Sequence, residues 1–435
     1  MTAVRYPAYP LIVHDPFFSC WSFTDDLAAD ATRHWTGALQ SLSCVVRIDG
    51  KAFRCMNAEP NGVPAARQTS VEVLPTRTVY AFEENGVRIR LSFLSPLLPA
   101  RMDVLSRPAA YVIFETESLD GAVHSVLFFY GVSGDFADGN NRVSYRSGKE
   151  RAMTWSRLRK GGMELLCIGR TNQPVLEKCG DDVRIDWGYV CLAVPGNTGA
   201  ATCLVDFRAA AETFAADGTL PADDCCALHT PFPENGISAC CAIPLTAGPG
   251  GTASAHVITA YNDFYSIEFL NRKLKGYWTL SFRSFEDMVT GAERDFAALD
   301  GECRAFDAEL LADASEAGGD GYAALLAAAF RQAVGAHKLV ADIDGTPLFF
   351  SKENFSNGCI ATVDVTYPSA PLFLLMQPEM LKGMMIPILE YASTARWKFP
   401  FAPHDLGTYP LANGQVYGGA ETSEEWQMPV EECGN

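Results

Sequence analysis

Three segments near the end of the chain carry side chains that could hydrolyse a bond. Each places carboxylates, and one a histidine, among glycine, proline and aromatic residues, in what we expect to be connections between helices. Hydrolysis of an amide or an acetal needs one group to move a proton and another to activate water or to form a covalent intermediate. The segments are residues 349–371 (FFSKENFSNGCIATVDVTYPSAP), 403–414 (PHDLGTYPLANG) and 428–435 (MPVEECGN).

Five residues in these segments are candidate catalytic groups. A loop carboxylate often caps a helix, and a histidine is often satisfied inside a turn, so a structural role stays open for each. Glu431 and Glu432 are the more suggestive pair, because neighbouring carboxylates can raise one pKa and leave an acid beside a base. Adjacent residues on a helix nevertheless point about 100° apart, so the two need not share a site. The candidates are Asp364, His404, Asp405, Glu431 and Glu432.

Candidate substrate-binding residues come from the same segments and from the start of the chain. Residues 14–22 (HDPFFSCWS) and 34–37 (HWTG) are rich in aromatic residues and lack a regular period. Aromatic rings beside His and Asp could form a platform for a sugar or an amino acid, and packing of a long loop between domains explains them equally well. The candidates are Trp21, Trp35, Lys352, Glu353 and Tyr409.

The sequence lacks several common catalytic and cofactor motifs. No lysine has Ser or Thr three residues before it, and no Gly-x-Ser-x-Gly occurs, so a serine acyl-enzyme is not supported. Residues 248–253 resemble a dinucleotide loop only in their glycines and have no helix pattern after them. Residues 342–345 (DIDG) lack the rest of a calcium loop and predict a turn. We therefore expect no cofactor and no metal.

Composition excludes some partners. The 435 residues carry a net charge of −18 and are 48% hydrophobic, which allows large buried cores but leaves little to attract nucleic acid or anionic lipid. No export signal and no apolar run of about 18 residues is present, so we expect a cytoplasmic, soluble chain without membrane contact. A small-molecule substrate, glutamine or a saccharide, is the expected partner, and the oligomeric state is open.

The cysteines are expected to be free thiols. Fourteen cysteines could form a disulfide framework, but that pattern is typical of small secreted domains. Neither the 225–226 pair nor the 240–241 pair has ligands at zinc-site spacing. Four cysteines recur every twelve residues, an interval that suits successive strands of a sandwich better than a repeated ligand set. They are Cys167, Cys179, Cys191 and Cys203.

Residues 40–260 have the pattern of short antiparallel strands. Alternating residues on either side of Asn85-Gly86 predict a hairpin over 78–93, and Asp49-Gly50 predicts another over 45–55. Residues 145–149 look like a third turn, 111–114 and 126–130 are further strand candidates, and 248–251 is a glycine-rich break. An antiparallel sandwich, or two joined, fits this pattern.

The period changes to helical after Tyr261. Apolar spacing predicts helices over 285–311 and 322–340, separated by a break at Gly318-Gly319-Asp320. In the second helix, an apolar face is expected from Tyr322, Leu325, Leu326, Ala329, Phe330 and Val334. A third helix is expected over 380–392, with Pro387 kinking it or marking its start. Segregated strands and helices indicate an α+β fold with an N-terminal aromatic-rich segment (1–60), a sandwich (61–260) and a helical domain (261–435).

An ordered set of strings resembles the glutaminase A family. They are HDPFFSCWS and HWTG, YNDFYSIEF from Tyr261, RQAVGAHKLV from Arg331, FFSKENFSNG with TVDVTYPSAP, PHDLGTYPLANG and MPVEECGN, and they span residues 10–435. The resemblance implies an N-terminal β-sandwich followed by a six-hairpin (α/α) toroid, with hydrolysis of L-glutamine to L-glutamate and ammonia as the family activity. Such toroids also host sugar chemistry, so the fold does not fix the substrate.

The chain departs from the family at its end. Members of the family continue past residues 433–435, and a six-hairpin toroid needs twelve helices, of which the sequence predicts about four. We therefore expect an incomplete toroid with apolar helix faces left exposed. Three hypotheses remain: a glutaminase-like amidohydrolase, a glycoside hydrolase-like enzyme of the toroid class, and a non-catalytic sandwich module that binds a saccharide or a protein.

Overall fold

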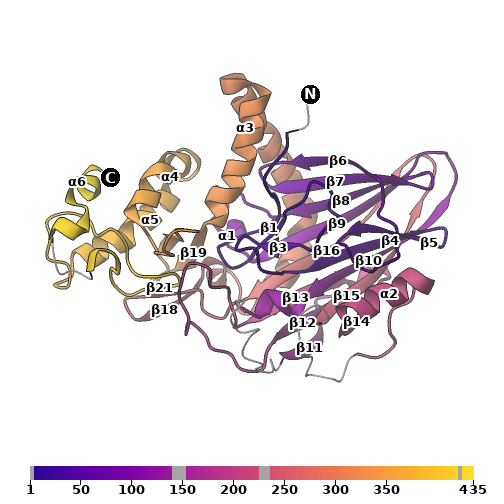
Figure 1. The fold of residues 1–435 in the computed structure, drawn as a ribbon, viewed down its shortest axis with the longest axis horizontal. Helices are drawn as coiled ribbons and strands as arrows, with labels where there is room; N and C mark the ends of the chain where they lie inside the picture. Colours follow the sequence, from indigo (N-terminus) through magenta and orange to yellow (C-terminus); the bar gives the residue numbers. More distant parts are fainter. Residues whose placement is uncertain (1–3, 140–152, 225–235, 420–423) are drawn as a thin grey trace.

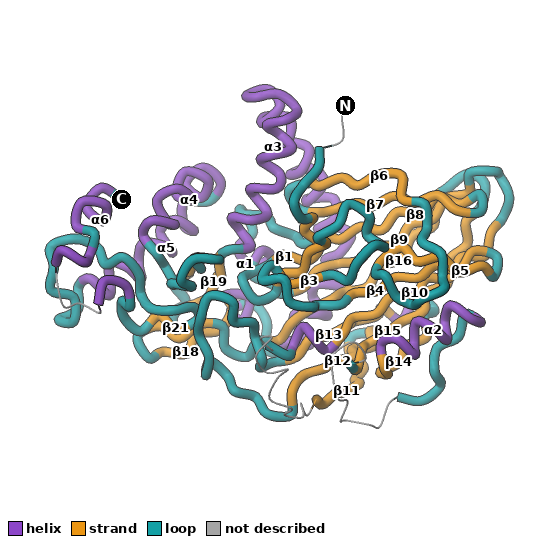
Figure 2. Tube along the Cα trace, viewed as in Figure 1, coloured by secondary structure: helices purple, strands orange, loops and turns teal. Residues whose placement is uncertain are grey.

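The computed structural model describes residues 4–139, 153–224, 236–419 and 424–435. Strands fill one side of the molecule and helices gather at the other, with the long helix α3 rising between them (Figure 1). Colouring by secondary structure makes the same division visible (Figure 2). The predicted mixture of large antiparallel sheets and a separate helical part is confirmed.

Two antiparallel sheets pack face to face. Phe114 of one sheet meets Phe128 of the other with ring centroids 5.2 Å apart, and the Tyr130 hydroxyl lies 3.1 Å from the Thr259 hydroxyl across the same core. The larger sheet has the order β11 (Met153–Lys160), β12 (Met163–Arg170), β13 (Tyr189–Pro195), β16 (Thr252–Asn262), β9 (Ala109–Ser118), β8 (Val87–Leu94), β7 (Arg77–Glu84), β6 (Gln68–Val73). The smaller has the order β14 (Ala201–Asp206), β15 (Ile237–Ala247), β10 (His124–Ser133), β4 (Leu42–Ile48), β5 (Lys51–Met56).

Local turn chemistry sets the strand register. Strands β7 and β8 pair in register up to Glu84 and Val87, so Asn85-Gly86 forms a two-residue loop with both φ angles positive. Asp49-Gly50 does the same between β4 and β5. This is the loop type whose twist suits a hairpin. Both predicted hairpins are confirmed, whereas the expected turn at 145–149 lies outside the described residues.

Helices cover the outer faces of the two sheets. On the smaller sheet, α2 (Phe207–Asp217) places Phe214 against Phe129, with ring centroids 5.5 Å apart. On the larger sheet, the first half of α3 (Phe285–Gly335) packs Met288 and its neighbours into a second core, and the Tyr111 hydroxyl donates to the Ala292 carbonyl at 2.7 Å.

Helix α3 breaks at Gly319, whose φ of 80° and ψ of 174° are not helical. The predicted break is confirmed, but the predicted helical end at residue 340 is wrong, because the second half ends at Gly335. Its expected apolar face is also partly wrong, since Tyr322 and Leu325 are exposed while Phe330 and Val334 are buried. The buried face of the second half therefore runs through Ala323, Ala327, Phe330 and Val334.

Two smaller sheets connect the sandwich to the helices. The N-terminal sheet consists of β1 (Tyr9–Val13), β2 (Ser19–Ser22) and β3 (Arg33–His34). The second has the order β20 (Pro347–Ser351), β19 (His337–Ala341), β18 (Arg272–Gly276), β17 (Ile267–Phe269), β21 (Leu411–Ala412), with only the last pair parallel. The turn predicted at 342–345 joins β19 to β20, and the Gly345 amide donates to the Asp342 carbonyl at 2.9 Å.

Three helices form the rest of the helical part. They are α4 (Val363–Met376), α5 (Pro378–Ala392) and α6 (Pro429–Gly434). Helix α5 begins at Pro378, so Pro387 lies inside the helix and is not its start. Short helical turns occur at α1 (Met102–Leu105), η1 (Gly134–Ala137), η3 (Gly196–Thr198), η4 (Tyr277–Leu280), η5 (Tyr417–Gly419) and η6 (Glu424–Gln427). No helix within the described ranges is long and apolar enough to cross a membrane.

The cysteines correct one expectation. Cys167 and Cys191 face each other on β12 and β13 and form a disulfide, so the prediction that all cysteines are free thiols is wrong. The twelve-residue interval predicted that all four cysteines lie on strands. Cys203 does lie on β14, but Cys179 lies in an exposed loop. The 225–226 pair lies outside the described residues.

Candidate active site

Two distant segments lie antiparallel at the helical end and bring candidate residues together. The Ile360 amide donates to the Gly407 carbonyl and the Leu406 amide to the Ile360 carbonyl, both at 3.0 Å. One step further, the Val363 amide donates to the His404 carbonyl at 2.9 Å. The start of α4 is thereby fixed beside the loop that carries His404.

His404 and Asp405 form a hydrogen-bonded pair. Nδ1 of His404 lies 3.0 Å from Oδ2 of Asp405, whose side chain is fully buried. The same carboxylate accepts from the backbone amides of Gly407 (2.8 Å), Val416 (3.0 Å) and Tyr417 (3.1 Å). Because this carboxylate already accepts three amide hydrogens, Nδ1 is the donor to it, which leaves Nε2 as the ring nitrogen that can act as acceptor or ligand.

The loop that follows holds the imidazole from its other sides. The Tyr417 ring stacks on the His404 ring at 4.1 Å between centroids, with an interplanar angle of 21°. Oε1 of Gln415 accepts from the His404 amide at 2.7 Å, and the Gln415 side chain also bonds the buried Gln427. The ring orientation is therefore set by packing and by hydrogen bonds together.

Nε2 of His404 points toward two carboxylates from two helices. It lies 3.8 Å from Oδ2 of Asp364, in the first turn of α4. One ligand atom each of Asp364, His404 and Glu432 lie within 4.8 Å of one another. Both acids sit in the first turn of their helices, where the helix dipole favours negative charge. Asn435 Nδ2 donates to Oδ1 of Asp364 at 2.7 Å and joins α6 to α4.

Glu432 is the unusual member of this group, which we call the Asp364–His404–Glu432 cluster. Its residue is 3% exposed, and neither carboxyl oxygen has a hydrogen-bond partner among the described residues. Burial, followed by the charge of Asp364, raises the pKa of Glu432 to about 7, against a smaller lowering by His404. Burial lowers the pKa of His404, but Asp405, Glu432 and Asp364 outweigh it, so the net shift is upward.

The other residue of the acidic pair does not join the cluster. Glu431 is exposed while Glu432 is buried, as the 100° offset between neighbours on a helix leads one to expect. The adjacency that made this pair suggestive in the sequence therefore does not produce a shared site. Glu432 instead meets acids and a histidine from other segments.

Three of the substrate-binding candidates lie together beside the cluster. Nζ of Lys352 sits 4.9 Å from the centre of the Trp35 ring and 3.3 Å from Oδ1 of Asp181. Burial is the largest effect on Lys352 and lowers its pKa. Oε2 of Glu353 accepts from the Thr362 hydroxyl at 3.2 Å. Residue 359 connects this group to the cluster. Its carbonyl accepts from the Glu353 amide at 2.9 Å, and its thiol lies within 4.8 Å of a His404 ring nitrogen.

The remaining two candidates are packed inside the protein. The Trp21 indole donates to the Ser19 hydroxyl at 2.8 Å within the N-terminal sheet. The Tyr409 ring meets the Phe17 ring at 5.0 Å between centroids and is 1% exposed. The structure therefore buries both rings with partners other than the cluster residues.

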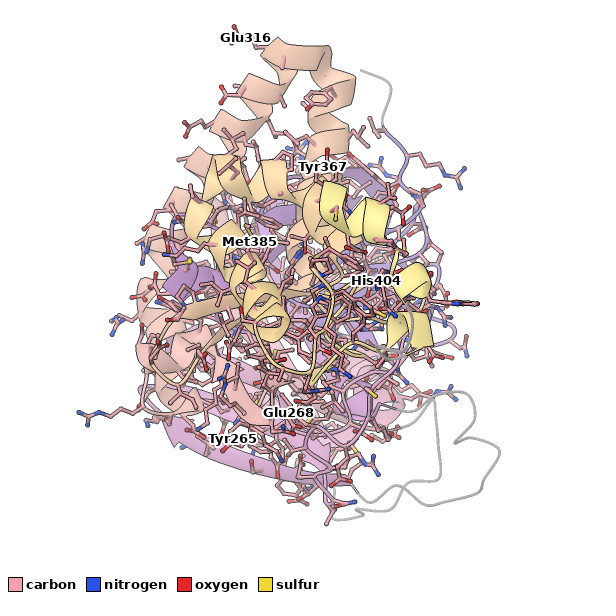
Figure 3. The ribbon with its side chains drawn as sticks, turned by 90° about the vertical axis from the view of Figure 1, so that its left-hand side faces the viewer. Tyr265, Glu268, Glu316, Tyr367, Met385 and His404 are labelled. Carbon is pink, nitrogen blue, oxygen red and sulfur yellow. A yellow bond between two sulfur atoms is a disulfide. The ribbon has the colours of Figure 1, made fainter. Side chains whose placement is uncertain are left out.

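A large cleft lies elsewhere. It encloses about 950 Å³ between the end of β16, β18 and the start of α3, and its lining contains Lys273, Lys275 and Arg283 but no carboxylate or histidine. In Figure 3, Tyr265 of that cleft lies well apart from His404, while Tyr367 and Met385 mark α4 and α5 and Glu316 marks the tip of α3. That cleft offers no acid–base pair, whereas the Asp364–His404–Glu432 cluster brings two carboxyl groups and an imidazole together.

Sequence patterns missed several residues that complete the site. Tyr417, Gln415 and Asn435 contact the candidates only because loops from separate segments meet, and no local motif marks them. Cys359 was within a nominated segment, and its thiol could join His404 and Asp405 in a second potential metal-ligand group. The candidate acids also lie partly on helices, since Asp364 belongs to α4 and Glu432 to α6, so the expectation that they all occupy loops is wrong.

Known proteins resemble this chain along nearly its whole length. The profile of the glutaminase A six helical-hairpin domain matches residues 319–435, and two domains of unknown function, DUF5127 and DUF4964, match 76–313 and 1–63. A protein named glutaminase A from Aspergillus oryzae is 28% identical over 99% of this chain and 62% of its own length. A probable glutaminase from Arthroderma benhamiae is 23% identical over 98% of this chain and 51% of its own length.

The chain thus spans between half and two-thirds of the length of these curated relatives. Among solved structures, a putative kojibiose phosphorylase from the human microbiome aligns over 75% of this chain and 39% of its own, at 9% identity and a TM-score of 0.39. A similarity this weak carries no conclusion about fold or activity.

Proposed function

We propose that this chain, which belongs to the glutaminase A family, forms part of a hydrolase that releases ammonia from L-glutamine at the Asp364–His404–Glu432 cluster. The observation that carries the proposal is the buried Glu432 carboxyl, which has no hydrogen-bond partner among the described residues beside His404 and Asp364. A carboxyl left in this state is costly for folding and is typical of a functional group.

The cluster suits the hydrolysis of an amide. Water must attack the amide carbon, the carbon–nitrogen bond must break, and a proton from the water must reach the departing nitrogen to give ammonia. The three side chains converge on one point from α4, from the 404–407 loop and from α6, so they can hold that water. Asp364 is the most open member, with 39% of its side chain exposed, and can exchange the proton. Asp405 acts as a positioning residue through His404.

Substrate contacts are proposed on the neighbouring side. Trp35 and Glu353 lie on this side and offer a ring and a carboxylate, which suit the cationic end of an amino acid, while the buried Lys352, paired with Asp181, lies against the Trp35 ring. In a longer chain that spans the relatives' full length, further helical hairpins would complete the proposed toroid around this site.

A second candidate is a glycoside hydrolase activity. The Asp364 and Glu432 atoms lie within 4.8 Å, near the roughly 5 Å that separates the two carboxyl groups of retaining glycosidases. One carboxylic acid would protonate the leaving oxygen and the other would attack. A binding role without turnover is the third possibility, and it predicts no product from either substrate class.

Ammonia release from L-glutamine tests the proposal. This chain and a chain extended to the relatives' length would be assayed with a glycoside panel alongside. Release from glutamine that disappears in Glu432→Gln but persists in the exposed neighbour variant Glu431→Gln is the expected result. A folded extended chain that is silent on glutamine and turns over a glycoside would overturn the proposal in favour of the second candidate.

A further inference from the structure

We propose that Asp364, His404 and Glu432 bind one divalent transition-metal cation of the zinc type. The proposal goes beyond the glutaminase activity, and it rests on the proposed function only for the role of a bound water. The sequence predicts no metal, because it holds no Cys or His motif at ligand spacing. The proposal departs from that expectation, because motif spacing cannot register ligands that come from three separate segments.

Charge balance is the first argument. Asp364 and Glu432 carry two negative charges when ionised, and His404 is a neutral ligand when its proton is on Nδ1. A divalent cation would neutralise the group completely. It would also give a partner to the Glu432 carboxyl, whose oxygens have none among the described residues. Buried charges are otherwise paired or coordinate metals.

The environment of His404 is the second argument. A metal-ligating histidine almost always donates its other ring N–H to a carboxylate, carbonyl or water, which fixes the ring and raises its basicity. Asp405 fills that role here at 3.0 Å from Nδ1, and three backbone amides hold Asp405 in place. Nε2, the free nitrogen, faces the two acids. Asn435 supports Asp364 in the same way, by donating to its other oxygen.

The ligand set indicates the kind of cation. One imidazole nitrogen and two carboxylate oxygens suit zinc or manganese better than calcium, which prefers six to eight oxygen ligands. Three protein ligands leave a fourth position for water in a tetrahedral zinc site. That position is where the attacking water of the proposed hydrolysis would sit.

A second possible set of metal ligands lies on the Nδ1 side of the His404 ring. Cys359 and Asp405 also have ligand atoms within 4.8 Å of a His404 nitrogen. That set would require Nδ1, which already bonds Asp405 at 3.0 Å, and Asp405 has three amide donors as well. Cys359 is buried, and burial, the largest effect, raises the pKa of its thiol, which opposes the thiolate that a metal needs. We therefore place the cation at the Nε2 side.

Equilibrium dialysis of the chelator-treated chain against zinc tests the site. We expect one zinc per chain in the wild type and in Glu431→Gln, Cys359→Ser and Cys433→Ser. Glu432→Gln and Asp364→Asn should lose the bound zinc. Asp405→Asn should weaken binding by roughly 10–100-fold, the usual effect of removing a partner behind a ligand. Melting temperatures in chelator would establish that each variant is folded.

Cobalt substitution gives a second measurement that separates oxygen and nitrogen ligands from sulfur. The cobalt-loaded wild type should show ligand-field bands without a thiolate-to-metal charge-transfer band. A wild-type chain that takes up no stoichiometric zinc would overturn the proposal, and so would zinc that survives Glu432→Gln but disappears in Cys359→Ser or Cys433→Ser. Ammonia release that persists in a metal-free chain would overturn the role given to the metal-bound water while leaving the glutaminase proposal standing.

Discussion

Two buried charged groups lie close to the helical end of this protein, and they are built on opposite principles. In one, which we call the Lys338 network and which consists of Lys338, Asp15 and Asp263, every charge has a partner. In the other, the Asp364–His404–Glu432 cluster, two acids and a histidine converge and one acid has no partner among the described residues. The difference separates a group that stabilises the fold from one for which we propose a functional role.

The Lys338 network joins three parts of the chain. Nζ of Lys338, on β19, lies 2.6 Å from Oδ2 of Asp15 and 3.0 Å from Oδ2 of Asp263. Oδ1 of Asp15 also accepts from the Phe17 and Phe18 amides, at 2.9 and 2.8 Å. Burial lowers the pKa of Lys338, but the two carboxylates outweigh it and the net shift is upward.

A buried charge whose hydrogen-bond and ion-pair partners are all present holds structural elements together. A buried charge that lacks such partners favours the binding of a proton or a cation instead. Burial raises the pKa of Asp15, yet Lys338 and the amide donors outweigh it and lower that pKa overall. The pKa of Glu432 moves in the other direction, for want of such partners. Two carboxylic acids of similar burial, Asp15 and Glu432, thus have a structural role in one region and a proposed functional role in the other.

Removal of Lys338 is expected to have the largest effect on stability. Lys338→Met would leave Asp15 and Asp263 buried without a cation, which typically costs about 3–5 kcal/mol. Urea denaturation in chelator measures the loss. Lys382→Met is the matched control, because Lys382 is exposed and its one ion pair among the described residues is with Glu379 at 3.3 Å, a contact worth about 0–1 kcal/mol. Equal losses in the two variants would contradict the contrast between the regions.

Glu432→Gln should change stability with the opposite sign. Removing a buried charge that lacks partners should leave the metal-free chain as stable as the wild type or more stable, by up to about 1–3 kcal/mol, the usual cost of an unsatisfied buried group. The measurement is urea denaturation in chelator, with Glu431→Gln as the exposed control. A loss of stability in Glu432→Gln alone would show that Glu432 is a structural residue.

The parts of the fold that follow local rules could be predicted from the sequence. Asn85-Gly86 and Asp49-Gly50 specify their hairpins within a few residues, and Gly319 breaks α3 at the predicted place. Strand β19 was missed because residues 337–340 continue the apolar spacing of the preceding helix, and only pairing with β18 and β20 makes them a strand. A tertiary contact overrode the local pattern there.

The candidate site shows the same limit. His404 and Asp405 are adjacent, so their pairing was within reach of the sequence, as was the nomination of Asp364 and Glu432 by residue type. The convergence of those acids on Nε2 required α4, α6 and the 404–407 loop to meet, which no spacing encodes. The strings that resemble the family also supply Asp15, Asp263 and Lys338, whose structural network was not foreseen.

A buried histidine beside the Lys338 network should make stability depend on pH. Burial, helped by the charges of Lys338 and Arg331, lowers the pKa of His14 to about 3 despite the opposing charge of Asp15. Unfolded His14 takes up a proton below pH ~6.5, whereas folded His14 does not, so stability falls as pH drops from about 6.5 toward 3. His14→Phe should flatten that slope by up to about 1.4 kcal/mol per pH unit. Urea midpoints across this range measure it, and an unchanged slope would show that His14 is protonated in the folded chain.

The smallest expected effect on stability concerns the exposed apolar side chains of the helical part. Most of the large apolar side chains exposed among the described residues lie beyond residue 319, on the helical side, although the sheets hold the larger core. On α5, Leu389 is 57% exposed while its neighbour Ile388 is 6% exposed. Leu389→Lys should therefore change the free energy of unfolding by less than about 0.5 kcal/mol, as for an ordinary surface substitution.

The same variant should reduce self-association, because contiguous exposed apolar faces favour contacts between copies. Sedimentation velocity across a range of concentrations measures this, and Ile388→Lys is the matched control that should unfold the helix instead. If Leu389→Lys lost stability as Ile388→Lys does, Leu389 would have a packing partner in solution. The apolar side chains of the helical part would then be as well buried as those of the sheets. The contrast between the two regions would hold only for the Lys338 network and the Asp364–His404–Glu432 cluster.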